Sequence, residues 1–308
     1  MHDLIGDIHG HATHLKALLT KLGYSEQDGV WSHPERKVIF LGDFVDRGPE
    51  QVETVRIAKA MVKARSALAV MGNHEFNAVG WCMPDPEKPG EFLRPHTDDK
   101  RNQHREFLNQ IGEGSAEHHE LLAWFRTLPL YLDREGLRVV HACWHPAHLA
   151  VLGPWLNDNG TLTSAGWHEA HRKGTPLYEA VEVTLKGLEM DLPDGISFHD
   201  KDGVERTRAR VRWWKEEGQT YRDLALIPDG SISATLPDEP IPAGLLPDLD
   251  DNRPVFFGHY WFKGEPEPLN ARAACLDYSV VAEPPAGKLV AYRWDSEQTL
   301  DASHFVYV

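Results

Sequence analysis

The sequence is poor in cysteine and contains no long apolar run. Its three cysteines, Cys82, Cys143 and Cys275, include no Cys-x-x-Cys pair, so a disulfide framework is excluded. The absence of a run of about 18 apolar residues argues against a membrane-spanning helix. The first residues also lack the basic and apolar regions of a signal peptide. These absences predict a cytoplasmic protein that does not bind membranes.

Basic residues are fewer than acidic ones. The chain has 32 Lys and Arg against 47 Asp and Glu, which gives a formal net charge of −15. Avid, non-specific binding of nucleic acid requires a basic surface that neutralises phosphates, and we do not expect it here. Otherwise the composition is that of an ordinary globular protein, with 41% apolar and 26% charged residues. No fixed-period repeat is present, and 308 residues suffice for one large domain or two small ones.

Three glycine-flanked polar clusters stand out in the first quarter of the chain. They are residues 6–10 (Gly-Asp-Ile-His-Gly), 42–49 (Gly-Asp-Phe-Val-Asp-Arg-Gly-Pro) and 72–75 (Gly-Asn-His-Glu). Each is too tight for a helix and too polar for a core. Their carboxylate, amide and imidazole groups are side chains that bind metals or transfer protons. These clusters are the first candidates for a functional site.

Each cluster comes directly after a short apolar run. These runs, residues 4–5, 37–41 and 67–71, are predicted strands. The first two are separated by a helical pattern of leucines at i, i+3, i+4 and i+7: Leu15, Leu18, Leu19 and Leu22. Gly23 suits the end of that helix, and Pro49 the start of a second one. Such alternation predicts a mostly parallel sheet. The carboxyl ends of its strands meet at one edge, so the three clusters should converge there.

Two later runs repeat this pattern of an apolar strand followed by a polar residue. Residues 137–140 end at His141, and residues 254–257 end at Gly258-His259. Strands of a second sheet are expected in the tail, at residues 273–277, 288–294 and 304–308.

Residues 150–250 differ from the rest of the chain. They contain a helical pattern at 177–188, a charged stretch at 206–214 and a segment rich in proline and aspartate from 228 to 254. Because scaffold strands resume after this block, we interpret it as an insertion that covers the site, within a single domain of residues 1–308. Residues 81–100, which are also rich in proline and aspartate, are predicted to form a loop.

Together the polar residues supply the ligands of two divalent cations. Carboxylate and carbonyl oxygens suit hard cations, whereas imidazole suits zinc, iron and manganese. A pair of ions about 3.5–4 Å apart needs a carboxylate that bridges them, and Asp43 is the predicted bridge. The first ion would be bound by Asp7, His9 and Asp43. The second would be bound by Asp43, Asn73, His141 and His259.

The order of these motifs resembles the calcineurin-like metallophosphoesterase family. Within it, Asp46-Arg47-Gly48 is similar to the phosphoprotein phosphatase branch, which includes Ser/Thr protein phosphatases and symmetrical diadenosine tetraphosphatases. The likeness runs from Asp3 to about Asp277 and leaves out residues 150–250. The wider family often ends its motif series with Gly-His-x-His. Here Trp261 stands in place of the second histidine, which the phosphatase branch also lacks.

The resemblance implies an α/β fold of two packed mixed β-sheets flanked by helices, an αββα sandwich, with the helical and irregular insertion over the site. It implies two divalent metal ions as cofactors. Manganese is favoured, and iron, zinc, nickel and cobalt remain open. A hydroxide that bridges the ions would attack phosphorus. In this scheme His74 is the general acid, Asp46 orients its ring, and Arg47 holds phosphate oxygens; Glu75 either supports His74 or caps a turn.

Other histidines compete for two of the ligand positions: His145 and His148 with His141, and His199 and His304 with His259. His141 is preferred because it directly ends an apolar run. His259 is preferred because it follows Gly258 at the end of a strand.

Arginines alternate before a pair of tryptophans. Residues 206, 208, 210 and 212 are all arginine and are followed by Trp213-Trp214. On a strand they would share one face, either as a solvated surface or as a phosphate clamp, with Arg210 and Arg212 as the candidates for substrate binding. The tryptophans either stack on a nucleobase or anchor the insertion in a core, and we favour the core.

These motifs predict a metal-dependent phosphoric ester hydrolase. The leading hypothesis is hydrolysis of phosphate monoesters in the manner of Ser/Thr protein phosphatases. Dinucleoside polyphosphates, nucleotides and RNA ends are the alternative substrates. A non-catalytic metal-binding module would have lost a ligand or the general acid, and none is missing. The oligomeric state does not follow from the sequence.

Overall fold

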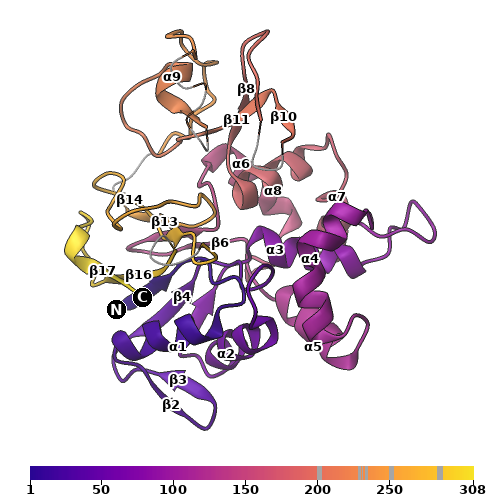
Figure 1. Cartoon of the computed structure of the whole chain (residues 1–308), viewed down its shortest axis with the longest axis vertical. Helices are drawn as coiled ribbons and strands as arrows, with labels where there is room; N and C mark the ends of the chain where they lie inside the picture. Colours follow the sequence, from indigo (N-terminus) through magenta and orange to yellow (C-terminus); the bar gives the residue numbers. More distant parts are fainter. Residues whose placement is uncertain (200–202, 228–229, 231, 233–234, 250–252, 283–286) are drawn as a thin grey trace.

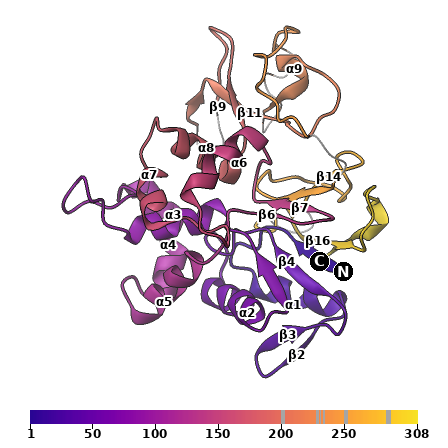
Figure 2. The same cartoon turned by 180° about the vertical axis from the view of Figure 1, so that it is seen from behind.

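The computed structural model describes residues 1–199, 203–227, 230, 232, 235–249, 253–282 and 287–308. Two mixed β-sheets lie at its centre, with helices outside them (Figures 1 and 2). The two chain ends lie close to each other beside the strands of the first sheet (Figure 1).

The first sheet contains the three strands that precede the polar clusters. These are β1 (His2–Ile5), β4 (Lys37–Phe40) and β5 (Ala67–Ala69), and β4 pairs with the other two in parallel. The crossovers are α1 (Ala12–Lys21) and α2 (Gln51–Lys63). Gly23 follows α1 with a φ of 90°, as expected of a residue after a helix end. The second helix starts at Gln51, two residues after Pro49.

The second sheet has the order β14-β13-β7-β6. Its strands are β6 (Tyr131–Asp133), β7 (Arg138–Val140), β13 (Val255–Phe257) and β14 (Ala273–Cys275). Strand β13 runs parallel to β7 and β14, and β6 runs antiparallel to β7. The strand ends that carry His141 and His259 are therefore neighbours.

Alternating side chains bury both faces of each sheet. Leu4 and Ile39 of the first sheet share one apolar cluster with Val139 and Phe256 of the second. Their neighbours in sequence, such as Ile5, belong to a separate cluster that includes the apolar faces of the helices. This two-residue alternation is what a sheet buried on both sides requires. The predicted αββα sandwich is confirmed.

The predicted assignment of the tail to the second sheet is wrong for most of its strands. Only β14 joins that sheet, whereas β15 (Asp277–Tyr278), β16 (Lys288–Trp294) and β17 (Phe305–Tyr307) extend the first one. The parallel strands β1, β4 and β5 leave one edge of β1 open, and β16 pairs with this edge antiparallel. Unpaired strand edges are unfavourable, so the tail completes the first sheet. The chain thus passes from one sheet to the other between β14 and β15.

Helices follow the third polar cluster and the end of β7. They are α3 (Asn73–Cys82), α4 (Asp98–Ile111), α5 (Ala116–Phe125), α6 (Pro146–Leu152), α7 (Ser164–Glu169) and α8 (Pro176–Lys186), with 3-10 turns at Gly153–Trp155 and Ala302–His304. The loop predicted at residues 81–100 is present at residues 83–97, whereas its first two residues belong to α3 and its last three to α4. No pattern noted in the sequence predicts α4 or α5.

Short elements make up most of the rest of the insertion. They are β8 (Glu189–Asp191), β9 (Phe198–His199), β10 (Glu205–Arg206), β11 (Arg208–Val211), α9 (Tyr221–Leu224) and β12 (Ala225–Leu226). They lie at the end of the molecule opposite the hairpin of β2 (Ser25–Gln27) and β3 (Val30–Ser32) (Figures 1 and 2). Within the described ranges, the helices are too short or too polar to span a bilayer.

Candidate metal centre

The glycines of the clusters allow their loops to press against one another. A Cβ atom on Gly72 would lie 2.2 Å from Oδ1 of Asp43 and 2.4 Å from its backbone nitrogen. A Cβ on Gly258 would lie 2.0 Å from Oδ1 of Asp7. Any side chain at these two positions would separate loops that are distant in sequence. The glycines are thus needed for the approach of the polar residues.

Replacement of Gly72 by alanine tests this packing. We expect Gly72→Ala to lower the free energy of unfolding by about 1–3 kcal/mol, the usual cost of overpacking, and the Tm by several degrees. Gly153→Ala is the matched control, because a Cβ there meets nothing within 4 Å. Thermal unfolding followed by circular dichroism measures both. Equal Tm values for the two variants would contradict the packing argument.

Asp43 lies at the centre of the converged loops. Its Oδ2 lies 3.7 Å from Nε2 of His9, 3.8 Å from Nε2 of His74 and 3.4 Å from Nε2 of His141. Its Oδ1 accepts a hydrogen bond of 3.0 Å from the backbone N–H of His74. Among the described residues, two groups have ligand atoms within 4.8 Å of one another: His9, Asp43 and His74, and Asp43, His141 and His259. Asp43 belongs to both groups.

Asp7 and Asn73 complete the set of predicted ligands. Oδ1 of Asn73 lies 3.1 Å from Nε2 of His141 and 2.9 Å from Nδ1 of His259. Oδ2 of Asp7 accepts a hydrogen bond from the backbone N–H of His259. All six predicted ligands are thus brought together, and each is buried.

The ring orientations suit metal binding. Nδ1 of His9 donates to the carbonyl of Val45 at 3.0 Å, and Nδ1 of His141 donates to the carbonyl of Leu41 at 2.7 Å. Such bonds hold a metal-binding imidazole with its other nitrogen toward the ion. In the described part of the chain, three buried atoms of the cluster have no hydrogen-bond partner: Oδ1 of Asp7, Nε2 of His9 and Nε2 of His259. Buried polar atoms are rarely left unpaired, and divalent cations would satisfy these.

Negative charge is concentrated here. Burial raises the pKa of Asp7, and the neighbouring charge of Asp277 raises it further. Burial and the charge of Asp43 raise the pKa of Glu75 to about 7. Burial alone would lower the pKa of His141, but Asp43 and Asp7 outweigh it and raise this pKa to about 10. A buried set of carboxylates needs cations close by. The residues present therefore fit a pair of divalent ions.

Glu75 secures the loop that carries Asp43. Its carboxylate accepts hydrogen bonds from the backbone N–H groups of Asp43, Phe44 and Gly72, at 2.8, 2.8 and 3.0 Å. It thus caps the start of α3 and fixes the 43–45 turn. Of the two roles predicted for it, these contacts favour the turn.

Several site residues have a left-handed backbone. The φ angles are 46° at His9, 51° at Asp43, 69° at Asp46, 77° at Arg47 and 72° at His259. Non-glycine residues adopt this region at a cost on the order of 1–3 kcal/mol each. Such strain persists only where the surrounding contacts impose it, and it is typical of functional sites.

The predicted acid–base residues lie beside the predicted metal ligands. Nδ1 of His74 lies 2.5 Å from Oδ2 of Asp46, and Nη2 of Arg47 lies 3.5 Å from Nε2 of His74. The guanidinium of Arg47 stacks 3.9 Å above the ring of Trp261. This cation–π contact occurs where the wider family often has a second histidine.

Three further residues at the site carry no predicted role. Nδ1 of His104 in α4 lies 2.6 Å from Oδ1 of Asp46. Asp277, which is buried, accepts hydrogen bonds from the backbone N–H groups of Trp261 and Ser279. The sequence signal that was available is the position of His104 on a helix whose buried residues are otherwise apolar. For Asp277 and Trp261 the sequence carries no comparable signal.

The two arginines predicted to bind substrate, Arg210 and Arg212, differ in their position relative to the cluster. The charge of Arg210, after burial, lowers the pKa of His259, so Arg210 lies near the cluster. Arg212 comes after the end of β11 and donates to the carbonyl of Asp223 at 3.4 Å. The described contacts do not bring Arg212 to the site. They also place Trp213 in a buried position, where its Nε1 donates to the carbonyl of Ala142.

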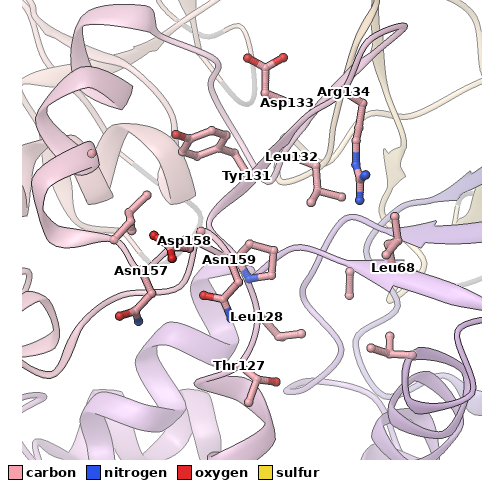
Figure 3. Close-up of a pocket in the computed structure, with 16 residues that line it drawn as sticks. Leu68, Thr127, Leu128, Tyr131, Leu132, Asp133, Arg134, Asn157, Asp158 and Asn159 are labelled. Atoms are coloured by element: carbon pink, nitrogen blue, oxygen red, sulfur yellow. The ribbon is translucent and has the colours of Figure 1, made fainter.

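A surface hollow lies apart from this cluster. Its volume is about 750 Å³, and residues of β5, β6 and the segment 156–160 line it (Figure 3). Tyr131, Asp133 and Arg134 form part of its wall. None of the predicted metal ligands lines it, so we do not connect it with the chemistry of the site.

Comparison with known proteins identifies the family. Residues 3–259 match the family described as calcineurin-like phosphoesterase. The chain belongs to this family. The resemblance to this family that the sequence motifs indicated is confirmed.

Two relatives and one solved structure are similar to this chain. An asymmetrical bis(5'-nucleosyl)-tetraphosphatase PrpE of Oceanobacillus iheyensis is 30% identical over 48% of this chain, and the match spans only 57% of that protein's length. A symmetrical bis(5'-nucleosyl)-tetraphosphatase of Proteus mirabilis is 25% identical over 96% of this chain and 94% of its own length. A cold-active protein tyrosine phosphatase has a TM-score of 0.51 and 17% identity over 95% of this chain and 73% of its own. That structure indicates a shared fold.

Proposed function

We propose that this chain hydrolyses dinucleoside polyphosphates at a two-metal centre. The observation that carries the two-metal centre is the position of Asp43, whose carboxylate belongs to two separate groups of potential ligands, and the similarity to a symmetrical bis(5'-nucleosyl)-tetraphosphatase supports the choice of substrate. One buried carboxylate between two sets of imidazoles is what a pair of neighbouring cations requires.

The protein residues have distinct roles in this proposal. Asp7, His9 and Asp43 would hold one ion, and Asp43, Asn73, His141 and His259 the other. When bound, the two ions would neutralise charge on the phosphoryl oxygens and lower the pKa of water. Manganese is the proposed metal.

The remaining steps fall to groups that face the ligands. Arg47, fixed on Trp261, would hold phosphate oxygens through its planar fork of donors. His74 would donate the proton on Nε2 to the leaving oxygen, while Asp46 holds Nδ1. His74 also lies in the first ligand group. We assign it to proton transfer because Nδ1 is engaged by Asp46 and Nε2 lies 3.5 Å from Nη2 of Arg47, the group that would hold the phosphate.

Basic side chains beside the centre support a polyphosphate substrate. Burial and the charges of Arg94, Lys173 and Lys186 lower the pKa of Lys100, so these three cations lie near Lys100. Burial lowers the pKa of Arg94, whereas the charges of Asp46 and Glu182 raise it, so Arg94 lies near the proposed acid–base pair. Lys186 also pairs with a glutamate of its own helix. In a chain of net charge −15, this local positive region favours a substrate with several phosphates.

Phosphate monoesters, including phosphoproteins, are the second candidate. The Asp46-Arg47-Gly48 element and the exposed side chain of Arg47 suit a single phosphate as well as a chain of them. Nucleotide monoesters and RNA ends require the same chemistry. A cytoplasmic location and a covering role for residues 150–250 stay predictions, as does the assignment of Arg210 to substrate binding.

A substrate panel tests the proposed function. We expect manganese-loaded protein to hydrolyse diadenosine tetraphosphate with a kcat/KM at least about tenfold above that for phosphopeptides, nucleoside monophosphates or bis-p-nitrophenyl phosphate. This ratio corresponds to about 1.4 kcal/mol of additional transition-state binding. Product analysis by chromatography measures each rate. A phosphopeptide rate above the dinucleotide rate would favour the second candidate instead.

Variants of the basic group refine the same panel. We expect Lys100→Ala to raise KM for diadenosine tetraphosphate about two- to fivefold, the scale of a solvent-exposed charge interaction. The rate with p-nitrophenyl phosphate should stay unchanged. Lys63→Ala, which removes an exposed lysine from α2, is the control. Equal effects of Lys100→Ala on both substrates would remove the basic group from substrate binding.

A further inference from the structure

The carboxylate of Asp46 lies between two imidazoles. Its Oδ2 lies 2.5 Å from Nδ1 of His74, and its Oδ1 lies 2.6 Å from Nδ1 of His104. The three side chains are buried. A further bond of 2.6 Å joins the backbone N–H of Asp46 to Oε1 of Gln51. Both oxygens of this carboxylate are therefore held by separate elements of the fold.

We propose that His104 is a positioning residue that fixes the carboxylate of Asp46 and, through it, the ring of His74. This inference rests on the proposed function, because it assigns a partner to the proposed general acid. A carboxylate held at one oxygen can still rotate about its terminal torsion. Donors on both oxygens define its plane, and with it the direction in which Nε2 of His74 points.

The charge of Asp46 is consistent with two donors. Burial opposes its ionisation, but the charge and hydrogen bond of His104 and the hydrogen bond of His74 outweigh this and hold the pKa of Asp46 below its usual range. An ionised carboxylate only accepts hydrogen bonds, so both Nδ1 atoms must carry hydrogen. Nε2 of His74 is then the nitrogen left facing Asp43 and Arg47.

Helix α4 holds His104 in place from two directions. Its buried residues, His104, Phe107, Leu108 and Ile111, follow i, i+3, i+4 and i+7 and dock the helix on the core. Gln110 of the same helix accepts from the backbone N–H of Gln51 at 2.8 Å and donates to the carbonyl of Pro49 at 2.9 Å. Helix α4 therefore binds this segment at two places: His104 contacts the side-chain carboxylate of Asp46, and Gln110 contacts the backbone of Pro49 and Gln51.

An apolar residue would fill the position of His104 at lower cost. Its other nitrogen, Nε2, is buried and has no hydrogen-bond partner among the residues that the structure describes. Burial of an unpaired polar atom is unfavourable, and the neighbouring buried positions of the helix are apolar. The bond to Asp46 is the one contact in the described structure that requires an imidazole here.

Variants at His104 separate positioning from packing. His104→Leu removes the donor, whereas His104→Asn keeps an amide N–H near the place of Nδ1. Rates are measured with manganese-loaded protein on p-nitrophenyl phosphate and on phenyl phosphate, whose leaving group needs protonation more strongly. For His104→Leu we expect kcat on phenyl phosphate to fall about 10- to 100-fold, the scale seen for partners of ligand side chains. The loss on p-nitrophenyl phosphate should be below about threefold, with KM unchanged. His104→Asn should stay within about threefold of the wild type on both.

Control variants keep the outcome interpretable. His118→Leu removes another buried imidazole, from α5, whose Nδ1 accepts from the backbone of Gly114 and does not touch Asp46. Any loss of kcat in His118→Leu should be the same on p-nitrophenyl phosphate and on phenyl phosphate. If His104→Leu does not fold, His104→Gln replaces it, because its longer amide reaches past the position of Nδ1.

The two proposals fail in different ways. A leaving-group effect in His74→Asn without one in His104→Leu or His104→Gln would overturn the role of His104 alone, as would equal losses in the leucine and asparagine variants. No leaving-group effect in His74→Asn would overturn the role of His74 as general acid and this inference with it, whereas no hydrolysis of diadenosine tetraphosphate by the wild type would overturn the proposed function.

Discussion

Replacement of His74 by asparagine is expected to lower kcat about 100- to 10,000-fold on substrates with poor leaving groups, the range for loss of a general acid. The physical reason is the position of Nε2, which lies 3.5 Å from Nη2 of Arg47 at the mouth of the cluster, where a phosphate would be held. Substrates such as p-nitrophenyl phosphate, whose leaving group departs without full protonation, should lose much less. Steady-state kinetics on a series of aryl phosphates measures the difference.

The metal content of the same variant decides between two roles of His74. Its Nε2 lies within ligand distance of the His9 and Asp43 group. If His74 donates a proton, His74→Asn should retain both ions, as measured by metal analysis after gel filtration. Loss of one ion per chain, with equal rate losses on all leaving groups, would make it a ligand and contradict the proposed proton transfer.

Replacement of Asp43 by asparagine should have the broadest effect on the centre. Both potential ligand groups contain its carboxylate, and an amide lacks the charge that offsets two divalent ions. We expect Asp43→Asn to lose affinity for both ions and to lower kcat/KM by a factor on the order of 1,000 or more, because several kcal/mol of charge stabilisation depend on the metals. Isothermal titration with manganese measures the number of sites.

Asp7→Asn is the matched control for the bridge. Asp7 is proposed as a ligand of the first ion only; its Oδ2 accepts a hydrogen bond from the backbone N–H of His259, and its Oδ1 has no partner among the described residues. Asp7→Asn should lower the affinity for one metal ion and leave the affinity for the other unchanged. Two ions per chain in Asp43→Asn, at affinities equal to the wild type, would remove the bridging assignment.

Much of the fold could be predicted because its signals are local. The runs before Gly6, Gly42 and Gly72 are strands, and the helical leucine pattern before Gly23 is a helix, since burial periodicity is written in neighbouring residues. The sheet membership of the tail could not be predicted in this way. Residues 288–294 read as a strand in either sheet, and only the open edge of β1 decided which one they joined.

The residues of the candidate site also fall into two groups, those that local sequence patterns predicted and those that only the tertiary structure brought together. Motif order and ligand chemistry in the sequence determined which aspartates, histidines and asparagine belong together, because glycine-flanked clusters at strand ends must meet at the edge of a parallel sheet. Only the tertiary structure placed His104 against Asp46 and Trp261 against Arg47, and it separated Arg210 from Arg212. These contacts depend on how a helix docks, how the chain crosses between sheets and where a short strand ends. Such features arise from packing between distant segments, which no local pattern in the sequence records.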